Sequence, residues 1–370
     1  MSDIRVKIFG AGSIGNHLAY ACRSKNWQVT ICDLDSAALE RTRTEIYPSR
    51  YGKWDDGITL AEVGKVAADP FDVVIVGTPP DSHMAIALDQ LARNAPRVMM
   101  IEKPLCPPDM RGCSELKAAA TAAGTFVGVG YNHTLTKNTQ LAEDWLRSHS
   151  IGDVVTLRSK TREHWRGIFG AHPWLAGPQD TYLGFTDRGG GAVGEHSHAI
   201  NIWQHFSHLT GHGRIVEVSA ALDMVEKDGA RYDRIAQISA RTESGLLGTI
   251  VQDVITEPAK KWLRVQGSDG FVEWEVNCDA THDAIRTRCD GGNVEETLIE
   301  KNRPDDFQAE IEHIDALLSD PSAAEQSPVS LERGLDTMLV IAAAIKSSKE
   351  KRTVAIDPSG GDSLTALRTL

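Results

Sequence analysis

The feature that most constrains the fold of this chain is a glycine-rich hexapeptide, Gly10-Ala11-Gly12-Ser13-Ile14-Gly15. It follows an apolar, β-branched run at residues 4–9 and opens a helical pattern at residues 13–24. In such a loop the first glycine permits a tight turn, the second lets the backbone approach a pyrophosphate, and the third lets helix and strand pack closely. The dipole of the helix N-terminus favours negative charge there. The loop predicts a dinucleotide site, although a glycine turn that binds nothing has the same pattern.

The first part of the chain alternates short strands with helices. Residues 72–77 (DVVIVG) form a continuous apolar run, as expected of a strand buried on both faces. We expect further strands at residues 28–32, 97–101 and 125–130, and helices at residues 35–45, 82–93 and 109–123. This order predicts an α/β fold with a doubly wound, parallel Rossmann sheet. Residues 45–64 break the alternation, and we expect them to form a surface excursion near the cofactor.

The length of 370 residues is more than one hydrophobic core usually serves, so two domains are expected. After Tyr131 several strands with tight turns follow one another up to residue 275, which predicts a large, open, mostly antiparallel sheet. We place a Rossmann domain at residues 1–131, a substrate-binding and oligomerisation domain at 132–357, and a loosely structured tail at 358–370. Helices are predicted at residues 141–147, 195–209, 305–318 and 330–348, the last of them packing back on the Rossmann domain.

Charge and composition exclude several classes of function. The net charge of −12 argues against a nucleic-acid partner, because a protein that neutralises phosphates needs a basic face. No run approaches the about 18 apolar residues of a membrane-spanning helix. The six cysteines show no CxxC spacing, and the first residues contain no apolar signal region. These features predict a cytoplasmic protein with reduced thiols and no membrane partner.

Asp33 bears on the choice of cofactor. It ends the second predicted strand, eighteen residues after Gly15, where an acidic residue can bind ribose hydroxyls. A carboxylate there accepts a hydrogen bond from a free 2′-hydroxyl and repels a 2′-phosphate, so NAD is favoured over NADP. Arg41 and Arg43 are interpreted as solvated surface charges, because their predicted helix also carries acidic residues.

Several further motifs resemble those of the glucose–fructose oxidoreductase and inositol dehydrogenase (Gfo/Idh/MocA) family, and the likeness covers nearly the whole chain. They are Gly77-Thr78-Pro79-Pro80 with His83, Glu102-Lys103-Pro104, Gly130-Tyr131-Asn132-His133, and Gly189-Gly190-Gly191 before a histidine-bearing helix. The resemblance implies alcohol-to-ketone chemistry on a sugar or polyol, and dimers or tetramers assembled through the second sheet. It adds Thr78, Pro79, His83, Glu102 and Lys103 to the cofactor site, and it suggests a cis Lys103–Pro104 peptide.

Oxidation of a secondary alcohol needs a base for the hydroxyl proton and positive charge beside the developing alkoxide. Lys103 follows a Rossmann strand at the edge where such sheets bind ligands, and we expect it to support the alkoxide; the alternative is a surface lysine. In the family an Asp and a His four residues later face the nicotinamide, but this sequence has Glu195 and His198 in a shifted register. We favour His198 as the base and Glu195 as an orienting group, with the reverse assignment and a helix-packing histidine as alternatives.

Other polar and aromatic residues complete the candidate substrate site. Asn132 and His133 are assigned to it, together with Trp165 from the Gly- and Pro-rich loop at residues 165–191. Trp165 is open to two interpretations: it stacks on a sugar, or it anchors the long loop. No metal is expected, because no cysteine or carboxylate completes a ligand set with the scattered histidines, which are His164, His172, His205, His208 and His212.

The resulting hypothesis is an NAD-dependent enzyme that transfers a hydride between nicotinamide and a secondary alcohol or ketone of a sugar. The substrate is expected to be a free sugar, a glycoside or a nucleotide sugar. Two alternatives stay open. One is a glycosidase that uses bound NAD for transient oxidation and elimination, and the other is a non-catalytic NAD-binding sensor.

Overall fold

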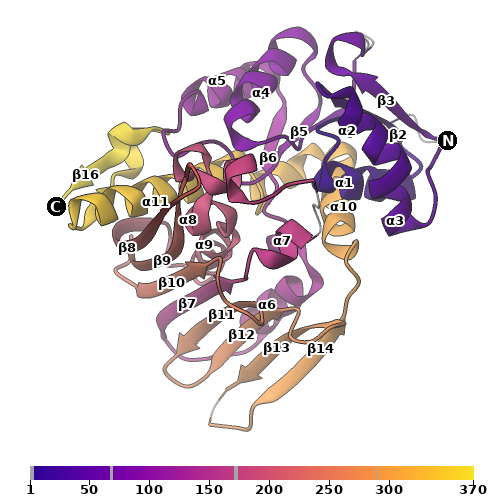
Figure 1. Cartoon of the computed structure of the whole chain (residues 1–370). Helices are drawn as coiled ribbons and strands as arrows, with labels where there is room; N and C mark the ends of the chain where they lie inside the picture. Colours follow the sequence, from indigo (N-terminus) through magenta and orange to yellow (C-terminus); the bar gives the residue numbers. More distant parts are fainter. Residues whose placement is uncertain (1–3, 67–69, 171–173, 290) are drawn as a thin grey trace. The chain divides into compact units, whose positions relative to one another are not determined.

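The computed structural model of the chain describes residues 4–66, 70–170, 174–289 and 291–370. The backbone divides into two compact units, each built on one β-sheet (Figure 1). The first unit comprises Met1–Leu105, Gly112–Asn132 and Arg303–Leu331, and the second comprises Cys106–Arg111, His133–Asn302 and Glu332–Leu370. Both units combine helices with strands, so the α/β class is confirmed.

The sheet of the first unit has six parallel strands in the order β3-β2-β1-β4-β5-β6. The strands are β1 (Arg5–Phe9), β2 (Gln28–Asp33), β3 (Ile58–Glu62), β4 (Val73–Val76), β5 (Val98–Ile101) and β6 (Phe126–Val129). The main helices among them are α1 (Ser13–Ser24), α2 (Ser36–Arg41), α4 (Pro80–Asn94) and α5 (Cys113–Ala123). Every residue of β4 and β5 is buried, as in a strand covered on both faces. The strand order reverses between β1 and β4, where open α/β sheets bind ligands, and the predicted doubly wound sheet is confirmed.

The segment at residues 45–64 is not a surface excursion, so that prediction is wrong. After α2 the chain continues through a π-helix (Thr42–Ile46) and α3 (Tyr47–Tyr51), and β3 then pairs with β2 as a parallel edge strand. The ring of Tyr51 stacks on Tyr20 of α1 at 3.8 Å. The sequence pattern missed β3 because this edge strand is only partly buried and has no continuous apolar run.

A segment distant in sequence completes the first unit. Helix α10 (Asp305–Ser319) packs beside α1. Lys25 and Asp315 form an ion pair of 3.0 Å, and the rings of His17 and Phe307 stack at 4.6 Å. The helical pattern at residues 305–318 was predicted correctly, but its place beside α1 depends on contacts across as many as 290 residues of sequence.

The second unit contains a ten-stranded sheet in the order β14-β13-β12-β11-β7-β10-β9-β8-β15-β16. Strands β7 and β10 pair in parallel, whereas their other neighbours pair antiparallel, which confirms a large, mostly antiparallel sheet. The strands are β7 (Val154–Arg162), β8 (Ile215–Lys227), β9 (Ala230–Thr242), β10 (Leu247–Asp253), β11 (Lys260–Gly267), β12 (Phe271–Val276), β13 (His282–Arg288), β14 (Glu295–Glu300), β15 (Val354–Ile356) and β16 (Leu367–Thr369).

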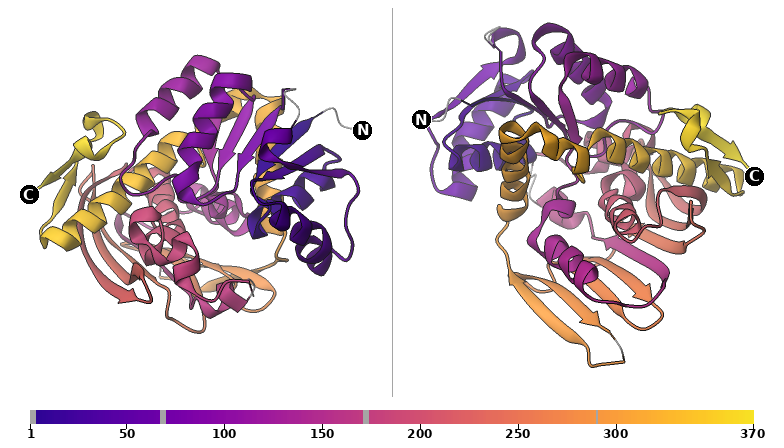
Figure 2. Two further views of the ribbon diagram at one scale, coloured as in Figure 1. Left: turned by 45° about the horizontal axis from the view of Figure 1, so that its top comes forward. Right: turned by 180° about the vertical axis from the view of Figure 1, so that it is seen from behind.

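Helices α9 and α6 pack against this sheet, which Figure 2 shows from two further directions. Helix α9 (His198–Leu209) lies against β7, β10 and β11, and α6 (Lys137–Ser148) lies against β12 and β13. The indole N–H of Trp203 in α9 donates to the carbonyl of Leu157 in β7 at 3.0 Å. Along β9 buried and exposed residues alternate, because successive side chains of a strand point to opposite faces. The face away from α9 is therefore lined by the polar and charged residues of these strands.

The C-terminal segment is more ordered than predicted. Residues 358–370 contain two short 3-10 turns and strand β16, which pairs antiparallel with β15. The prediction of a loose tail is wrong, because a strand of three residues is too short to show a periodic pattern. Helix α11 (Leu331–Glu350) belongs almost wholly to the second unit, and its packing on the Rossmann domain stays a prediction. Among the described residues, no helix is both long and apolar enough to cross a membrane.

Candidate functional site

The glycine loop joins β1 to α1, and each of its three glycines has different surroundings. Gly10 has a φ of +104°, and a Cβ atom there would lie 2.6 Å from the carbonyl oxygen of Gly77. A Cβ atom on Gly15 would collide with the carbonyl oxygen of Gly10, so only glycine lets α1 approach β1 this closely. A Cβ atom on Gly12 would meet nothing within 4 Å, and no side chain caps the first turn of α1. This open space and the helix N–H groups fit a dinucleotide pyrophosphate.

Asp33 lies at the end of β2, beside the glycine loop. Its Oδ2 accepts a hydrogen bond from the amide of Ala11 at 2.8 Å, and its Oδ1 accepts one from the amide of Asp35 at 3.0 Å. These bonds fix the carboxylate at the loop, and a carboxylate has lone pairs for further donors. The position fits the expected contact with the ribose hydroxyls.

Arg50, on α3, is a residue that the sequence analysis missed. Its guanidinium donates to the carbonyl of Ser13 at 2.8 Å and to the hydroxyl of Ser13 at 2.7 Å. Since Ser13 is the first residue of α1, Arg50 adds positive charge at the helix end where a phosphate is expected. No motif marks Arg50, because its place depends on how the π-helix and α3 fold back on α1.

The loop between β4 and α4 contains Thr78 and Pro79. The hydroxyl of Ser82 donates to the Thr78 hydroxyl oxygen at 2.7 Å. His83 is buried: its Nε2 lies 2.7 Å from the carbonyl oxygen of Thr78, and its Nδ1 lies 3.1 Å from that of Leu105. Burial lowers the pKa of His83. This histidine therefore joins the Thr78 loop to the segment that follows Lys103.

Glu102 and Lys103 follow β5 at the carboxyl edge of the sheet. The Lys103–Pro104 peptide is cis, which confirms that expectation. The carboxylate of Glu102 lies over Gly130, where a Cβ atom would come within 2.9 Å of Oε1. Glu102 also interacts electrostatically with Glu310 of α10, and burial followed by this repulsion raises the pKa of the Glu310 carboxyl well above its usual range. Glu310 was missed because a single glutamate in an amphipathic helix carries no signal of its own.

In the second unit His133 and His198 lie side by side. Their imidazole rings stack with centroids 4.2 Å apart, and the ring of Trp274 lies 5.7 Å from that of His133. The carbonyl of His133 accepts hydrogen bonds from the hydroxyls of Thr136 at 2.8 Å and Thr139 at 2.6 Å, which fix its backbone. The fold thus brings the two imidazole rings into direct contact. Both histidines were predicted from the sequence, but their contact was not.

Glu195 and His198 lie on two successive helices: the helix predicted at residues 195–209 is confirmed from His198 to Leu209, but it is interrupted after Glu195. Helix α8 (Gly191–Glu195) ends at Glu195, and α9 begins at His198. Gly191 is the first residue of α8 and has a φ of +72°, a backbone conformation that favours glycine. The hydroxyl of Tyr182 donates to Oε2 of Glu195 at 3.2 Å. Because the helix is interrupted between them, Glu195 and His198 do not share one helical face at an i, i+3 spacing.

Trp165 anchors the Gly- and Pro-rich loop in the core of the second unit. Its side chain is 4% exposed and belongs to a cluster with Leu183, Ala192 and Val254. This position favours the anchoring interpretation over sugar stacking. Asn132, a further candidate for the substrate site, is buried at the start of a 3-10 turn (Asn132–Leu135).

Three of the histidines considered for a metal, His164, His205 and His212, contact protein groups. Nε2 of His205 lies 2.7 Å from Oε1 of Glu143, which joins α9 to α6. Burial, and then Arg333, lower the pKa of His208 to about 4. His172 lies outside the described residues. Within the part of the chain that the structure describes, no three His, Cys, Asp or Glu side chains are grouped to hold a metal ion.

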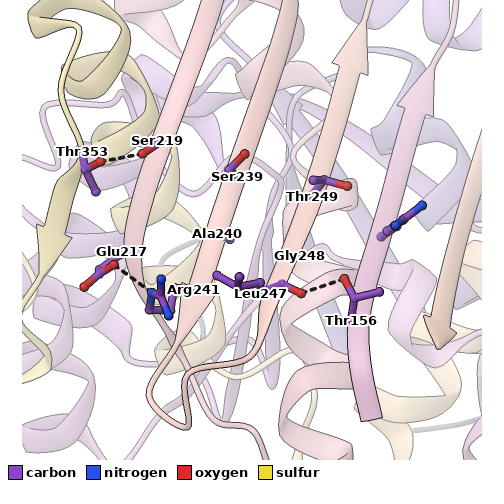
Figure 3. Close-up of a pocket in the computed structure, with 11 residues that line it drawn as sticks. Thr156, Glu217, Ser219, Ser239, Ala240, Arg241, Leu247, Gly248, Thr249 and Thr353 are labelled. Carbon is purple, nitrogen blue, oxygen red and sulfur yellow. Dashed lines mark hydrogen bonds and ion pairs between the residues drawn. The ribbon is translucent and has the colours of Figure 1, made fainter. Parts of the chain in front are cut away.

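The polar face of the second sheet carries a shallow depression of about 590 Å³ (Figure 3). Across it the hydroxyl of Thr156 donates to the carbonyl of Leu247 at 2.7 Å, and Arg241 donates to Glu217 at 3.1 Å. The side chain of Leu247 is exposed at the edge of this depression. Strands β7 to β10 thus present an ordered polar surface with an apolar residue on it.

Comparison with known families matches both parts of the chain. A family model described as an oxidoreductase family with an NAD-binding Rossmann fold matches residues 4–131. A model of the GFO/IDH/MocA C-terminal domain matches residues 139–273. A 1-carboxy-3-chloro-3,4-dihydroxycyclohexa-1,5-diene dehydrogenase of Comamonas testosteroni is 28% identical over 152 residues, which are 41% of this chain and 34% of that protein. The match spans about a third of the length of that curated relative.

Solved structures share the fold over nearly the whole chain. An aldose-aldose oxidoreductase from Caulobacter crescentus, complexed with glycerol, has a TM-score of 0.74 and 19% identity, over 96% of this chain and 100% of its own. The WlbA dehydrogenase from Bordetella pertussis, in complex with NADH and UDP-GlcNAcA, has a TM-score of 0.69 and 15% identity, over 96% of this chain and 99% of its own. At these identities the likeness shows the fold.

Proposed function

The chain belongs to the glucose–fructose oxidoreductase, inositol dehydrogenase and MocA family of NAD-binding oxidoreductases, and from this premise we propose that it acts on a secondary alcohol or ketone of a sugar. The substrate is a free sugar, a glycoside or a nucleotide sugar. The observation that carries the proposal is the glycine loop with Asp33 hydrogen-bonded to it, in a unit whose fifth strand leads into Glu102 and Lys103. The sugar-acting names of the two similar structures support the substrate class.

The residues of the first unit fit NAD. The loop from Gly10 to Gly15 takes the pyrophosphate, and Asp33 takes the ribose hydroxyls, which favours NAD over NADP. Bound nicotinamide supplies the hydride acceptor for the alcohol carbon, or the donor in the reverse direction. Thr78, Pro79 and Glu102 border this site, and His83 holds the Thr78 loop.

Lys103 and His198 act on the alcohol oxygen. The ammonium of Lys103 donates to that oxygen and stabilises the alkoxide that forms. His198 accepts the hydroxyl proton as general base, and His133, stacked on it, limits the rotation of its ring. Glu195 orients the sugar, with its carboxylate held by the hydroxyl of Tyr182. Asn132 and His133 supply further polar contacts to the substrate.

The decisive experiment measures NADH fluorescence with the full-length protein, NAD and a panel of sugars, glycosides and nucleotide sugars. We expect NADH to accumulate in step with one class of oxidised sugar. Cleavage of a glycoside without net NADH would assign the chain to NAD-dependent glycosidases instead. Tight NAD binding without turnover of any compound would favour a sensor, and the absence of NAD binding would contradict the proposal.

We also propose that the chain forms a homodimer or homotetramer through the polar face of the second sheet. The ordered surface across β7 to β10 and the exposed Leu247 support this assembly. Light scattering at micromolar concentration should give the mass of a dimer or tetramer. Leu247→Glu should shift it toward the monomer, whereas Met224→Glu, at another exposed apolar residue of the same unit, should not. A monomeric parent protein would refute the proposal.

A further inference from the structure

A buried carboxylate holds the start of α8. Asp233 of β9 has no exposed surface. Its Oδ2 accepts a hydrogen bond from the amide of Val193 at 2.8 Å, and its Oδ1 accepts one from the hydroxyl of Thr186 at 2.8 Å. The oxygen of that hydroxyl accepts in turn from the Asp233 amide at 3.0 Å, so the hydroxyl proton is directed to the carboxylate. The carboxylate therefore ties α8 and the turn at Thr186 to the same strand.

The run of glycines before α8 is shaped around this carboxylate. Gly191 has a φ of +72°, and a Cβ atom on it would collide with Oδ1 of Asp233. A Cβ atom on Gly190 would collide with the carbonyl oxygen of Tyr182. Glycine is therefore needed at these two positions because the Asp233 carboxylate approaches Gly191 and the Tyr182 carbonyl approaches Gly190.

Strand β10 also contacts the first turn of α8, through the backbone carbonyl groups of that turn. Nε2 of Gln252 in β10 lies 3.4 Å from the carbonyl oxygen of Ala192 and 3.3 Å from that of Val193. Burial raises the pKa of the Asp233 carboxyl to about 7, whereas the hydrogen bonds from Thr186 and Val193 lower it. Because a buried carboxylate is unfavourable without hydrogen bonds, the bond to Val193 is needed by Asp233 as much as by α8.

We propose that Asp233 is a positioning residue, which holds the amide of Val193 and thereby sets the place of Glu195 and His198. Helix α8 has five residues, and so short a helix is not stable without tertiary contacts. Its position, and that of Glu195 at its end and His198 after it, therefore depends on the groups that hold its first turn. The inference rests on the proposed function, in which Glu195 and His198 act on the substrate.

The test compares variants of the intact protein by hydrogen exchange of residues 191–197 and by the imidazole NMR resonance of His198. Asp233→Ala should speed exchange about 10- to 150-fold, the value of one hydrogen bond to a charged group, and should shift the His198 resonance. Asp233→Asn should restore most of the protection, because its amide oxygen can face Val193 while its NH₂ group donates to Thr186. Asp223→Asn, which alters an exposed carboxylate on β8, is the control and should change neither signal.

Unchanged exchange and an unchanged His198 resonance in Asp233→Ala would overturn the proposal. If that variant does not fold, Thr186→Val replaces it: this change removes one hydrogen-bond donor and should produce the same two changes at smaller size. Measurement of kcat then separates the positioning role of Asp233 from the proposed oxidoreductase function. With an active parent, Asp233→Ala should lower kcat on the order of 100-fold at an unchanged dissociation constant for NAD, and an unaltered kcat would refute the positioning role. An inactive parent would count against the proposed function, while exchange and the His198 resonance still decide whether Asp233 holds the turn.

Discussion

Replacing Asp33 with alanine tests the cofactor site most directly. The variant loses the carboxylate expected to accept from the ribose 2′-hydroxyl, and it also loses the two hydrogen bonds to the amides of Ala11 and Asp35. The loss of the loop bonds weakens the binding of NAD and NADP alike. The ratio of the two dissociation constants therefore isolates the contact with the 2′ position.

The size of the change follows from the chemistry of this contact. A hydrogen bond to a charged group contributes about 1.5–3 kcal/mol, so NAD should bind roughly 10- to 150-fold more weakly. NADP never had that bond, and its 2′-phosphate no longer meets a carboxylate. Two unit charges about 4 Å apart interact with about 4 kcal/mol at an effective dielectric constant of about 20. The preference for NAD should therefore fall by at least about 10-fold.

Isothermal titration calorimetry with NAD and with NADP, at one fixed salt concentration, measures this ratio. The matched control is Asp35→Ala, which removes an equally charged side chain two residues away. Asp35 is largely exposed and caps α2 by accepting from the amide of Ala37 at 2.9 Å, so its loss should leave the ratio nearly unchanged. The reasoning is refuted if the parent binds NADP as tightly as NAD, or if Asp33→Ala leaves the ratio as it was.

Three further predictions concern turnover and stability. Lys103→Ala and His198→Ala should each lower kcat about 100- to 10,000-fold while the Kd for NAD changes little, and a His198→Ala variant within a few-fold of the parent would disprove its role as base. Glu195→Gln should mainly raise KM, because it weakens the binding of the sugar. If it abolishes kcat while His198→Ala lowers kcat only slightly, the two roles are exchanged. Burial lowers the pKa of His17 from 6.5 to about 3, so the stability contributed by the neutral ring is present above pH 6.5 and is lost as the pH falls toward 3. His17→Phe should therefore flatten the fall in thermal stability over this range, and an equal fall in parent and variant would contradict it.

The order of strands and helices in the first unit was predictable because its signals are local. The β-branched run at residues 72–77 shows burial on both faces, and it appears as β4 in the centre of the sheet. The edge strand β3 was not predictable because it is only partly buried and has no continuous apolar run, and the terminal strand β16 was not because it has only three residues. Their pairing with β2 and β15, and not their own pattern, makes them strands.

The site divides in the same way. Asp33 was predictable because it follows the glycine loop at a spacing that any chain with this fold shares. The contact of His133 with His198, the hydrogen bonds of Arg50 to Ser13, and the proximity of Glu310 to Glu102 were not, since each joins separate elements. Neither residue type nor spacing distinguishes these side chains from ordinary surface or core residues.

The sequence by itself determined the fold class, the dinucleotide loop and the identity of the residues at the ends of β2 and β5, because turns, strands and helix starts depend on residues close together in the chain. Only the tertiary structure decided which of the many ionisable side chains support the site. Asp233 lies 40 residues from Val193, and its carboxylate holds α8 only because β9 runs beneath that helix. What a buried charge does depends on the donors packed around it, and a linear pattern cannot contain that information.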